Sequence, residues 1–231
     1  ARGQMAITPW PEATWLSVNS TYSTYATTYQ MAQAAYDLTP AKPFFQIEGY
    51  YENEHAMTAQ QLRAQAYWTL LSGGMGYVFG NCPLWGLGAP AASFCSKADS
   101  AWKTQLDSPG SASMVHVAEL FRPRAWQDLV PDRSHIVLIA GYGTFGNPDF
   151  AAAERTADGS LVLAYLPTIR TVTVDMAELP GPVAARWYDP TNGTYTAVSG
   201  SPFANDGAQP FTPPSTNTAG DGDWVLVLEA A

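Results

Sequence analysis

The sequence predicts an α/β part with parallel strands, followed by an all-β part that forms an antiparallel sandwich. In the first part, short apolar strands alternate with stretches of helical periodicity, a pattern typical of parallel strands joined by crossover helices. In the second part, short strand-like runs are separated by turn signals such as Asp158-Gly159 and Asn192-Gly193, which favour β-hairpins. We expect the first domain to cover residues 1–131 and the β-sandwich domain to cover residues 132–231.

Three strand–helix units are predicted in the first part. The apolar runs that indicate strands lie near Trp15, Ile47 and Val78, at residues 14–19, 44–47 and 75–80. Helical periodicity indicates helices at about residues 24–36, 59–70 and 114–121. Thr58 and Gln61 have the spacing of a capping box at the start of the second helix. Three units are too few to close an eight-stranded barrel, which takes roughly 250 residues.

The remaining segments of the chain are expected to be loops and short strands. Between the third strand and the last helix, residues 81–108 have the composition of a loop. Beyond Pro131 the β-like runs lie at residues 136–140, 161–166, 171–174, 183–188 and 224–228.

Composition and charge limit the classes of partner. The chain has 231 residues, of which 46% are apolar and only 13% charged, so it can bury a sizeable core. A formal net charge of −9 disfavours nucleic acid and anionic membrane surfaces. No apolar run approaches the length of a membrane helix, and we expect no signal peptide within these 231 residues. We expect neither nucleic acid nor membrane as a partner, and we expect further sequence before Ala1.

The only two cysteines, Cys82 and Cys95, flank a loop-like segment rich in Pro and Gly. An even pair around one loop favours a disulfide and therefore an oxidising compartment, outside the cytoplasm. The alternative is a pair of buried free thiols. The spacing matches no common zinc pattern, and no histidine lies nearby in the sequence.

One stretch of the first part ends an apolar strand in a carboxylate. Phe44, Phe45 and Ile47 favour a packed strand, Glu48 follows them, and Gly49 allows the chain to turn at once. A carboxylate at the carboxyl end of a barrel strand, surrounded by aromatic residues, is typical of the catalytic group of a sugar-cleaving enzyme. The alternative is a surface glutamate at the end of an ordinary strand.

Other chemistries find little support in the sequence. His55, His116 and His135 are scattered, and the chain contains no nucleophile elbow, phosphate loop or dinucleotide fingerprint. Asp221 and Asp223 suit either calcium or a glycine-rich turn. We therefore expect no cofactor and no metal.

Several motifs occur in a distinctive order along the chain. They are Glu-Gly-Tyr-Tyr-Glu at 48–52, Leu-Arg-Ala-Gln-Ala-Tyr-Trp at 62–68, Leu-Ser-Gly-Gly-Met-Gly-Tyr at 71–77, Gly-Asn-Cys-Pro-Leu-Trp at 80–85, Trp-Gln-Asp-Leu-Val-Pro-Asp at 126–132, Arg-Trp-Tyr-Asp-Pro-Thr-Asn-Gly at 186–193 and Asp-Trp-Val-Leu at 223–226. In that order they resemble the apiosidase-like glycoside hydrolases. In that family a (β/α)8 barrel precedes a β-sandwich named after collagen binding by a collagenase.

The resemblance implies that this chain corresponds to the carboxyl-terminal part of such a protein. The strand near Trp15 would then be the sixth of the barrel, Glu48 would close the seventh, and Val78 would lie in the eighth. Glu48 would take the strand-seven role of catalytic carboxylate, and its proton-donating partner would lie in an absent amino-terminal half. That half would be a partner, supplied by the same gene product or by a second chain.

The resemblance also implies which residues contact a glycan substrate. Aromatic rings bind the apolar faces of sugars, and amides bind their hydroxyl groups. The residues expected after the three strands are Asn19, Tyr22, Tyr50, Tyr51, Glu52, Asn81 and Trp85, and each can instead be a core or loop residue. Tyr67 and Trp68 are expected in the core.

Three interpretations of the whole chain follow. The first is the carboxyl-terminal part of a secreted glycoside hydrolase that cleaves O-glycosidic bonds in plant or microbial polysaccharide, a chain with little or no activity by itself. The second is a β-sandwich that binds carbohydrate or protein. The third is a β-sandwich that only braces the barrel.

Overall fold

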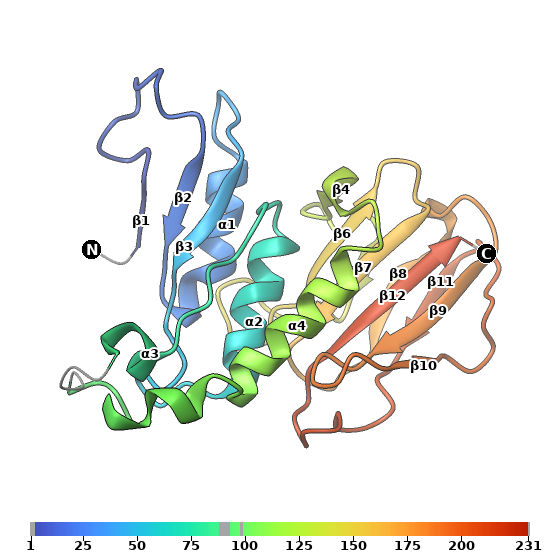
Figure 1. Ribbon diagram of the computed structural model, residues 1–231. Helices are drawn as coiled ribbons and strands as arrows, with labels where there is room; N and C mark the ends of the chain where they lie inside the picture. The colour runs from blue at the N-terminus through green and yellow to red at the C-terminus, as the bar shows by residue number, and fades with distance from the viewer. Residues whose placement is uncertain (1–2, 88–92, 98, 231) are drawn as a thin grey trace. The chain divides into compact units, whose positions relative to one another are not determined.

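The computed structural model describes residues 3–87, 93–97 and 99–230. The chain divides into two compact units, Ala1–Ala118 and Glu119–Ala231. Mixed α/β structure fills the first unit and antiparallel strands dominate the second, as Figure 1 shows. This confirms the predicted succession of an α/β part and an all-β part.

In the described part of the chain, the first unit carries three strands and most of the helices. Its elements, in which η marks a 3-10 helix, are β1 (Gln4–Met5), β2 (Asn19–Tyr22), η1 (Tyr25–Thr27), α1 (Thr28–Tyr36), β3 (Phe44–Glu48), α2 (Ala59–Leu70), α3 (Cys82–Gly86), η2 (Asp99–Gln105) and the greater part of α4 (Pro109–Phe121).

The strands of the first unit form a small mixed sheet in the order β1-β2-β3. β2 and β3 are parallel, with Asn19 opposite Phe44 and Tyr22 opposite Glu48, so their carboxyl ends lie at the same edge (Figure 1). The expected third parallel strand is reduced to one bridge, Gln46 to Tyr77, on the other side of β3. Gly76 and Gly80 interrupt that segment, and glycine weakens a strand because it adds backbone entropy and no packing.

The predicted strand around Trp15 is wrong in position, because the strand begins at Asn19. Residues 6–15 contain a series of turns, with backbone hydrogen bonds such as Trp10 N to Ile7 O and Ala13 N to Trp10 O. Trp15 itself is 67% exposed. Burial decides the strand, since Asn19 and Thr21 are fully buried in β2, against which α1 packs, although their side chains are polar.

The two helices that cover the sheet begin and end as the sequence predicts. The Thr58 hydroxyl accepts a hydrogen bond from Gln61 N at 3.2 Å, and Gln61 Oε1 accepts one from Thr58 N at 3.0 Å. This capping box starts α2, and Gly73 follows its end with a left-handed φ of +87°. Tyr67 and Trp68 are fully buried, as expected for core residues.

The segment expected to be a loop over residues 81–108 contains two short helices, α3 and η2. Pro83 at the start of α3 favours a helical first turn, a local signal that the loop-like composition obscured. The predicted disulfide between Cys82 and Cys95 is confirmed, with Cα atoms 5.9 Å apart.

The second unit is built almost entirely from short strands. Its elements after α4 are η3 (Trp126–Asp128), β4 (Leu129–Pro131), β5 (Leu138–Ala140), β6 (Ala152–Thr156), β7 (Leu161–Leu166), β8 (Val172–Asp175), η4 (Met176–Glu178), β9 (Val183–Tyr188), β10 (Tyr195–Ala197), β11 (Ala208–Phe211) and β12 (Trp224–Ala230). Five of these strands were predicted, and β4, β6, β10 and β11 were not.

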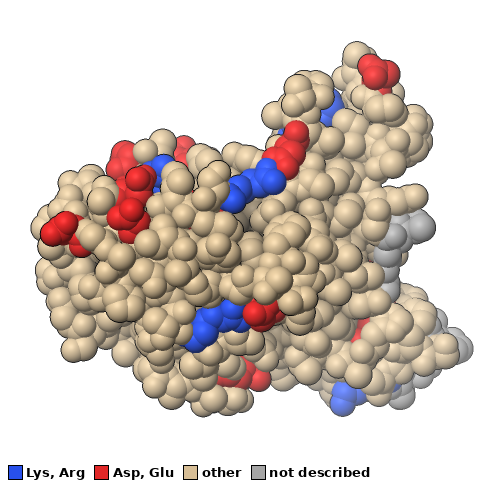
Figure 2. Space-filling view, turned by 180° about the vertical axis from the view of Figure 1, so that it is seen from behind, with Lys and Arg blue, Asp and Glu red and all other residues tan. Residues whose placement is uncertain are grey.

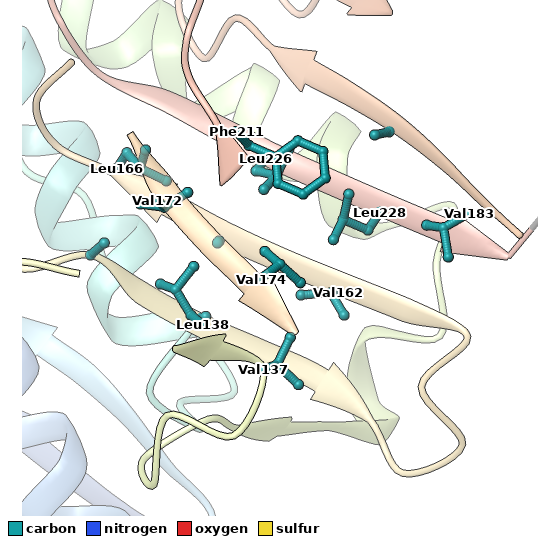
Figure 3. Close-up of a cluster of buried hydrophobic side chains, with 14 of the residues drawn as sticks. Val137, Leu138, Val162, Leu166, Val172, Val174, Val183, Phe211, Leu226 and Leu228 are labelled. Carbon is teal, nitrogen blue, oxygen red and sulfur yellow. The ribbon is translucent and has the colours of Figure 1, made fainter. Parts of the chain in front are cut away.

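Two antiparallel sheets share one hydrophobic core in the second unit. The larger sheet has the order β10-β9-β12-β7-β6-β4, and the smaller has the order β11-β8-β5. Figure 3 shows apolar side chains of both sheets gathered in this core, among them Leu166, Leu226, Val172, Val174 and Phe211. Each such side chain stabilises the fold by about 1.5–3 kcal/mol when fully buried.

The turn signals of the second unit are explained by hairpins and by buried carboxylates. Asp158-Gly159 joins β6 to β7, and Asn192-Gly193 joins β9 to β10, both as predicted. Asp223 is fully buried and accepts hydrogen bonds from Tyr165 Oη at 3.1 Å and Asn217 Nδ2 at 2.8 Å. These bonds favour the turn interpretation of the aspartates over calcium.

Charged side chains lie scattered among uncharged ones on the face of the molecule that Figure 2 shows. Over the described residues, no three His, Cys, Asp or Glu side chains come together as metal ligands do. In the same part of the chain, every helix is too short or too polar to cross a bilayer.

Candidate active site

Glu48 and Tyr22 end neighbouring parallel strands and contact one another. The Tyr22 hydroxyl donates a hydrogen bond to Glu48 Oε1 at 3.0 Å. Both side chains are half-buried, so the carboxylate is oriented by a donor and is still accessible to a ligand. Two parallel strands with chemically useful side chains at their carboxyl ends are the usual framework of a site in α/β proteins.

The chain immediately after Glu48 is held by the buried amide of Gln65. Gln65 Oε1 accepts a hydrogen bond from Tyr50 N at 3.0 Å, and Gln65 Nε2 donates one to Tyr50 O at 2.9 Å. A Cβ atom at Gly49 would lie 2.4 Å from both Gln65 Oε1 and Gln46 Nε2, so a larger residue there would have to displace these two buried amides. The motif at residues 62–68 thus contributes a clamp from α2 that fixes the turn beside Glu48.

Tyr51 and Tyr77 lie near one another and near this turn. The ring of Tyr51 lies against Gly80, where a Cβ atom would overlap the ring. Tyr77 Oη accepts a hydrogen bond from Gln65 Nε2 at 3.4 Å. Burial raises the pKa of Tyr77 above its usual value, and the nearby Tyr51 and Glu52 add to this shift. Tyr77 therefore stays a neutral hydrogen-bonding group at physiological pH.

Glu52 is enclosed by protein and directed at the start of α4. Its side chain is only 6% exposed, and its Oε1 accepts a hydrogen bond from Gly110 N at 2.9 Å. Its Oε2 accepts bonds from Ser108 Oγ and from Asn81 Nδ2, the latter at 3.2 Å. A carboxylate at a helix N-terminus satisfies free backbone donors and interacts well with the helix dipole. Glu52 is thus occupied in joining the loop after β3 to α4.

Asn81 belongs to the same buried group. It is 2% exposed, and its Oδ1 accepts a hydrogen bond from Asn53 Nδ2 at 3.0 Å while its Nδ2 donates to Ser108 Oγ at 3.0 Å. A parallel bridge between Glu52 and Asn81 places the two backbones side by side. Asn81 therefore links the loop after β3 to the residues just before α4.

The remaining candidates are Asn19 and Trp85. Asn19 lies at the amino end of β2, opposite Phe44, and its Oδ1 accepts a hydrogen bond from Ile7 N at 3.1 Å. It is therefore at the other end of the strands from Glu48. Trp85 lies on α3 and is 53% exposed.

The sequence indicated Glu48 and the expected substrate-binding residues, but not the residues that hydrogen-bond to them. Gln65, Asn53, Ser108 and Gly110 received no role, although Gln65 stands inside one of the quoted motifs. Gln65 lies between Ala64 and Ala66 in the predicted helix, and this position was the available signal, since an amide that becomes buried needs hydrogen-bond partners.

Comparison with known protein families assigns the first part of the chain. The family model described as "Apiosidase-like, catalytic domain" matches residues 3–128. The chain belongs to the apiosidase-like family. A second family model, described as "Putative collagen-binding domain of a collagenase", matches residues 130–229 of this apiosidase-like chain.

Solved structures share the fold of this apiosidase-like protein. A glycoside hydrolase of family 5 from Bacteroides vulgatus superposes with a TM-score of 0.86 at 22% identity, over 99% of this chain and 53% of the other. A second protein, described as a glycoside hydrolase, gives 0.84 at 22% identity, over 99% and 56%. This chain therefore spans about half the length of the structures it matches. No curated protein gave a significant match.

Proposed function

We propose that this chain supplies the carboxyl-terminal part of the (β/α)8 barrel of a secreted glycoside hydrolase, followed by a β-sandwich. The substrate class is plant or microbial polysaccharide, and the reaction is hydrolysis of an O-glycosidic bond. The observation that carries the proposal is the contact of Glu48 with Tyr22 at the carboxyl ends of two parallel strands. The family match over residues 3–128 supports it.

Glu48 is the catalytic carboxylate in this proposal. Glycoside cleavage uses two carboxyl groups, one to protonate the leaving oxygen and one to attack the sugar or activate water. Glu48 takes the second role, because its Oε1 is held by one donor at 3.0 Å and its side chain is half-exposed. The Tyr22 hydroxyl keeps the carboxylate in one orientation, which reduces the entropy lost on reaching the transition state.

The proton donor comes from outside this chain. Glu52 is enclosed and bonded to the start of α4, and Glu54 is 4% exposed and accepts a hydrogen bond from Tyr51 N at 3.3 Å. Neither is placed to flank a sugar opposite Glu48. An amino-terminal barrel half, from the same gene product or a second chain, supplies the missing carboxyl group. By itself this chain is then weakly active or inactive.

Secretion is the setting that suits the disulfide between Cys82 and Cys95. Disulfides persist in oxidising compartments and are rare in the cytosol. Polysaccharides of plant and microbial cell walls are found in the same setting, outside the cell.

Replacement of Glu48 in the full-length enzyme tests the proposal. Glu48→Gln keeps the shape of the side chain but cannot attack or accept a proton, so hydrolysis of aryl glycosides and pectic oligosaccharides should be abolished while the unfolding midpoint hardly changes. Glu12→Gln is the matched control, because Glu12 is exposed in the turns before β2. Wild-type turnover of the Glu48→Gln enzyme would make Glu48 a structural residue and refute the assignment.

A further inference from the structure

Three aromatic rings lie in a row beside the candidate site, the first pair tilted by 48° and the second pair stacked. The ring centroids of Tyr50 and His55 are 4.6 Å apart, and those of His55 and Phe94 are 5.5 Å apart with planes inclined by only 13°. Tyr50 is two residues beyond Glu48, so the stack begins at the catalytic candidate. We refer to Tyr50, His55 and Phe94 as the aromatic ladder.

The backbone around His55 adopts conformations that residues other than glycine seldom adopt. Asn53, His55 and Ala56 have φ angles of +66°, +48° and +57°, in the left-handed region. Non-glycine residues seldom adopt this region, and alanine gains nothing there that would offset the strain. Strained residues of this kind gather at binding and catalytic sites, where the surrounding structure holds them.

The surrounding structure indeed holds this loop independently of its rings. His55 N donates to Phe94 O at 3.1 Å, and Ser96 N donates to Asn53 O at 2.7 Å. Glu54 and Cys95 form an antiparallel bridge, and Cys95 is bonded to Cys82. Backbone pairing and a disulfide therefore fix the loop. The aromatic rings are not needed for that purpose, so their presence calls for another explanation.

The two outer rings of the ladder are exposed, and the inner one is half-buried. Tyr50 is half-buried, His55 is exposed, and Phe94 is 41% exposed. A preorganised row of rings with one end in solvent presents flat apolar surface at little entropic cost. The CH groups on one face of a sugar ring match such a surface.

We propose that the aromatic ladder is a carbohydrate subsite that binds the apolar face of a sugar ring beyond the one attacked by Glu48. The choice of ligand rests on the proposed function, since a polysaccharide chain continues past the cleaved bond. Phe94 and His55 provide the stacking surface, and Tyr50 connects that surface to the catalytic turn held by Gln65.

Binding to this chain tests the ladder without any need for catalysis. Neutral xylo-, arabino- and galacto-oligosaccharides are titrated while the ring proton signals of His55 and Phe94 are followed by NMR. At least one of the three should shift both sets of signals. Phe94→Leu keeps an apolar side chain without a ring and should weaken that binding about two- to tenfold, the worth of one aromatic contact. Phe94→Tyr should bind like the wild type.

Two controls separate the subsite from the fold and from catalysis. Phe145→Leu removes another exposed ring, in the second unit, and should leave binding unchanged. Second, the titration measures binding alone and needs no turnover, so a failure of the catalytic proposal at Glu48 leaves this result untouched. In the full-length enzyme, Phe94→Leu should raise KM for oligosaccharides and leave kcat for small aryl glycosides unchanged, whereas a loss of loop structure would lower kcat for both.

Equal affinities of the wild type and the Phe94→Leu chain would overturn the subsite, as would unshifted ring signals with every oligosaccharide of the panel.

Discussion

The Tyr22 hydroxyl donates a hydrogen bond to Glu48 Oε1 at 3.0 Å, and the two residues end adjacent parallel strands. Neither residue is near the other in sequence, so only the parallel register of β2 and β3 brings them together. The contact gives a carboxylate one fixed neighbour and leaves its other oxygen without a partner in this pair. Such an arrangement suits a group that must approach a sugar from a defined direction.

The first prediction removes that contact. Tyr22→Phe should lower kcat/KM of the full-length enzyme for aryl glycosides by roughly 10–100-fold, because a hydrogen bond to a charged group is worth about 1.5–3 kcal/mol. Steady-state kinetics with the two enzymes provide the measurement. Tyr36→Phe is the control, since Tyr36 is an exposed tyrosine against Gly73 at the end of α2. Unaltered kinetics of Tyr22→Phe would show that Glu48 needs no orientation by this residue.

The second prediction concerns the junction of Glu52 with α4. A Cβ atom at Gly110 would lie 2.7 Å from both Glu52 Oε2 and Leu62 Cδ1, two buried groups. Gly110→Ala should therefore lower the free energy of unfolding by about 1–3 kcal/mol. Gly181→Ala is a matched control, because nothing lies within 4 Å of the Cβ atom built there. Urea unfolding of both variants decides, and equal midpoints would mean that the Glu52 junction is loosely packed.

Much of the fold could be predicted from local signals. The capping box of Thr58 and Gln61, the glycine after α2, the hairpin turns and the strands β7 and β9 depend on neighbours in sequence, and all occur as expected. The strand β2 was misplaced because its burial under the helices depends on distant residues. Polar strand residues such as Asn19 and Thr21 carry no apolar pattern from which a strand could be inferred.

The candidate site, too, could be predicted only in part. Glu48 could be found because an apolar run and a glycine mark the end of its strand. The roles of Glu52 and Asn81 could not, because both side chains bond to groups more than twenty residues away, at Ser108 and Gly110. An acid in a loop looks solvated in the sequence until the helix N-terminus that binds it is known.

The third prediction concerns pH and the motif Arg-Trp-Tyr-Asp-Pro-Thr-Asn-Gly. Burial of Asp189 opposes its ionisation, but hydrogen bonds from Thr191 and Thr218 outweigh that effect and hold the pKa of Asp189 below its usual value. Thr191 N and Thr218 N donate to its two oxygens at 2.8 and 2.9 Å. A lowered pKa in the folded state stabilises the protein above the unfolded pKa of about 3.9, and this stabilisation is lost as the pH falls through the folded value.

Asp189→Asn should accordingly be less stable than the wild type at pH 7 by about 1–3 kcal/mol, and the difference should shrink below about pH 4. Urea unfolding at a series of pH values measures it. Asp206→Asn, at an exposed aspartate, should match the wild type at neutral pH. A difference between Asp189→Asn and wild type that is constant with pH would show that shape, and not charge, makes the aspartate important.

The last prediction concerns the face of the small sheet that α1 and α2 leave uncovered. Side chains alternate along a strand, so Ile47 points away from the face that buries Phe44 and Gln46. Val78 lies on the segment bridged to Gln46 and is also exposed; the two residues are 47% and 42% exposed. In the proposed barrel this face is covered by the amino-terminal half. Without that half, apolar surface next to unpaired strand edges favours association.

This chain alone should therefore form dimers or larger species in sedimentation velocity, and their share should increase with concentration. Ile47→Lys places a charge on the face and should shift the distribution towards monomer. Ile169→Lys, at a residue of the second unit that is 43% exposed, should not. A wild-type chain that stays monomeric at all concentrations would count against the barrel proposal, because a sheet face that needs no cover gives no reason to expect a missing half.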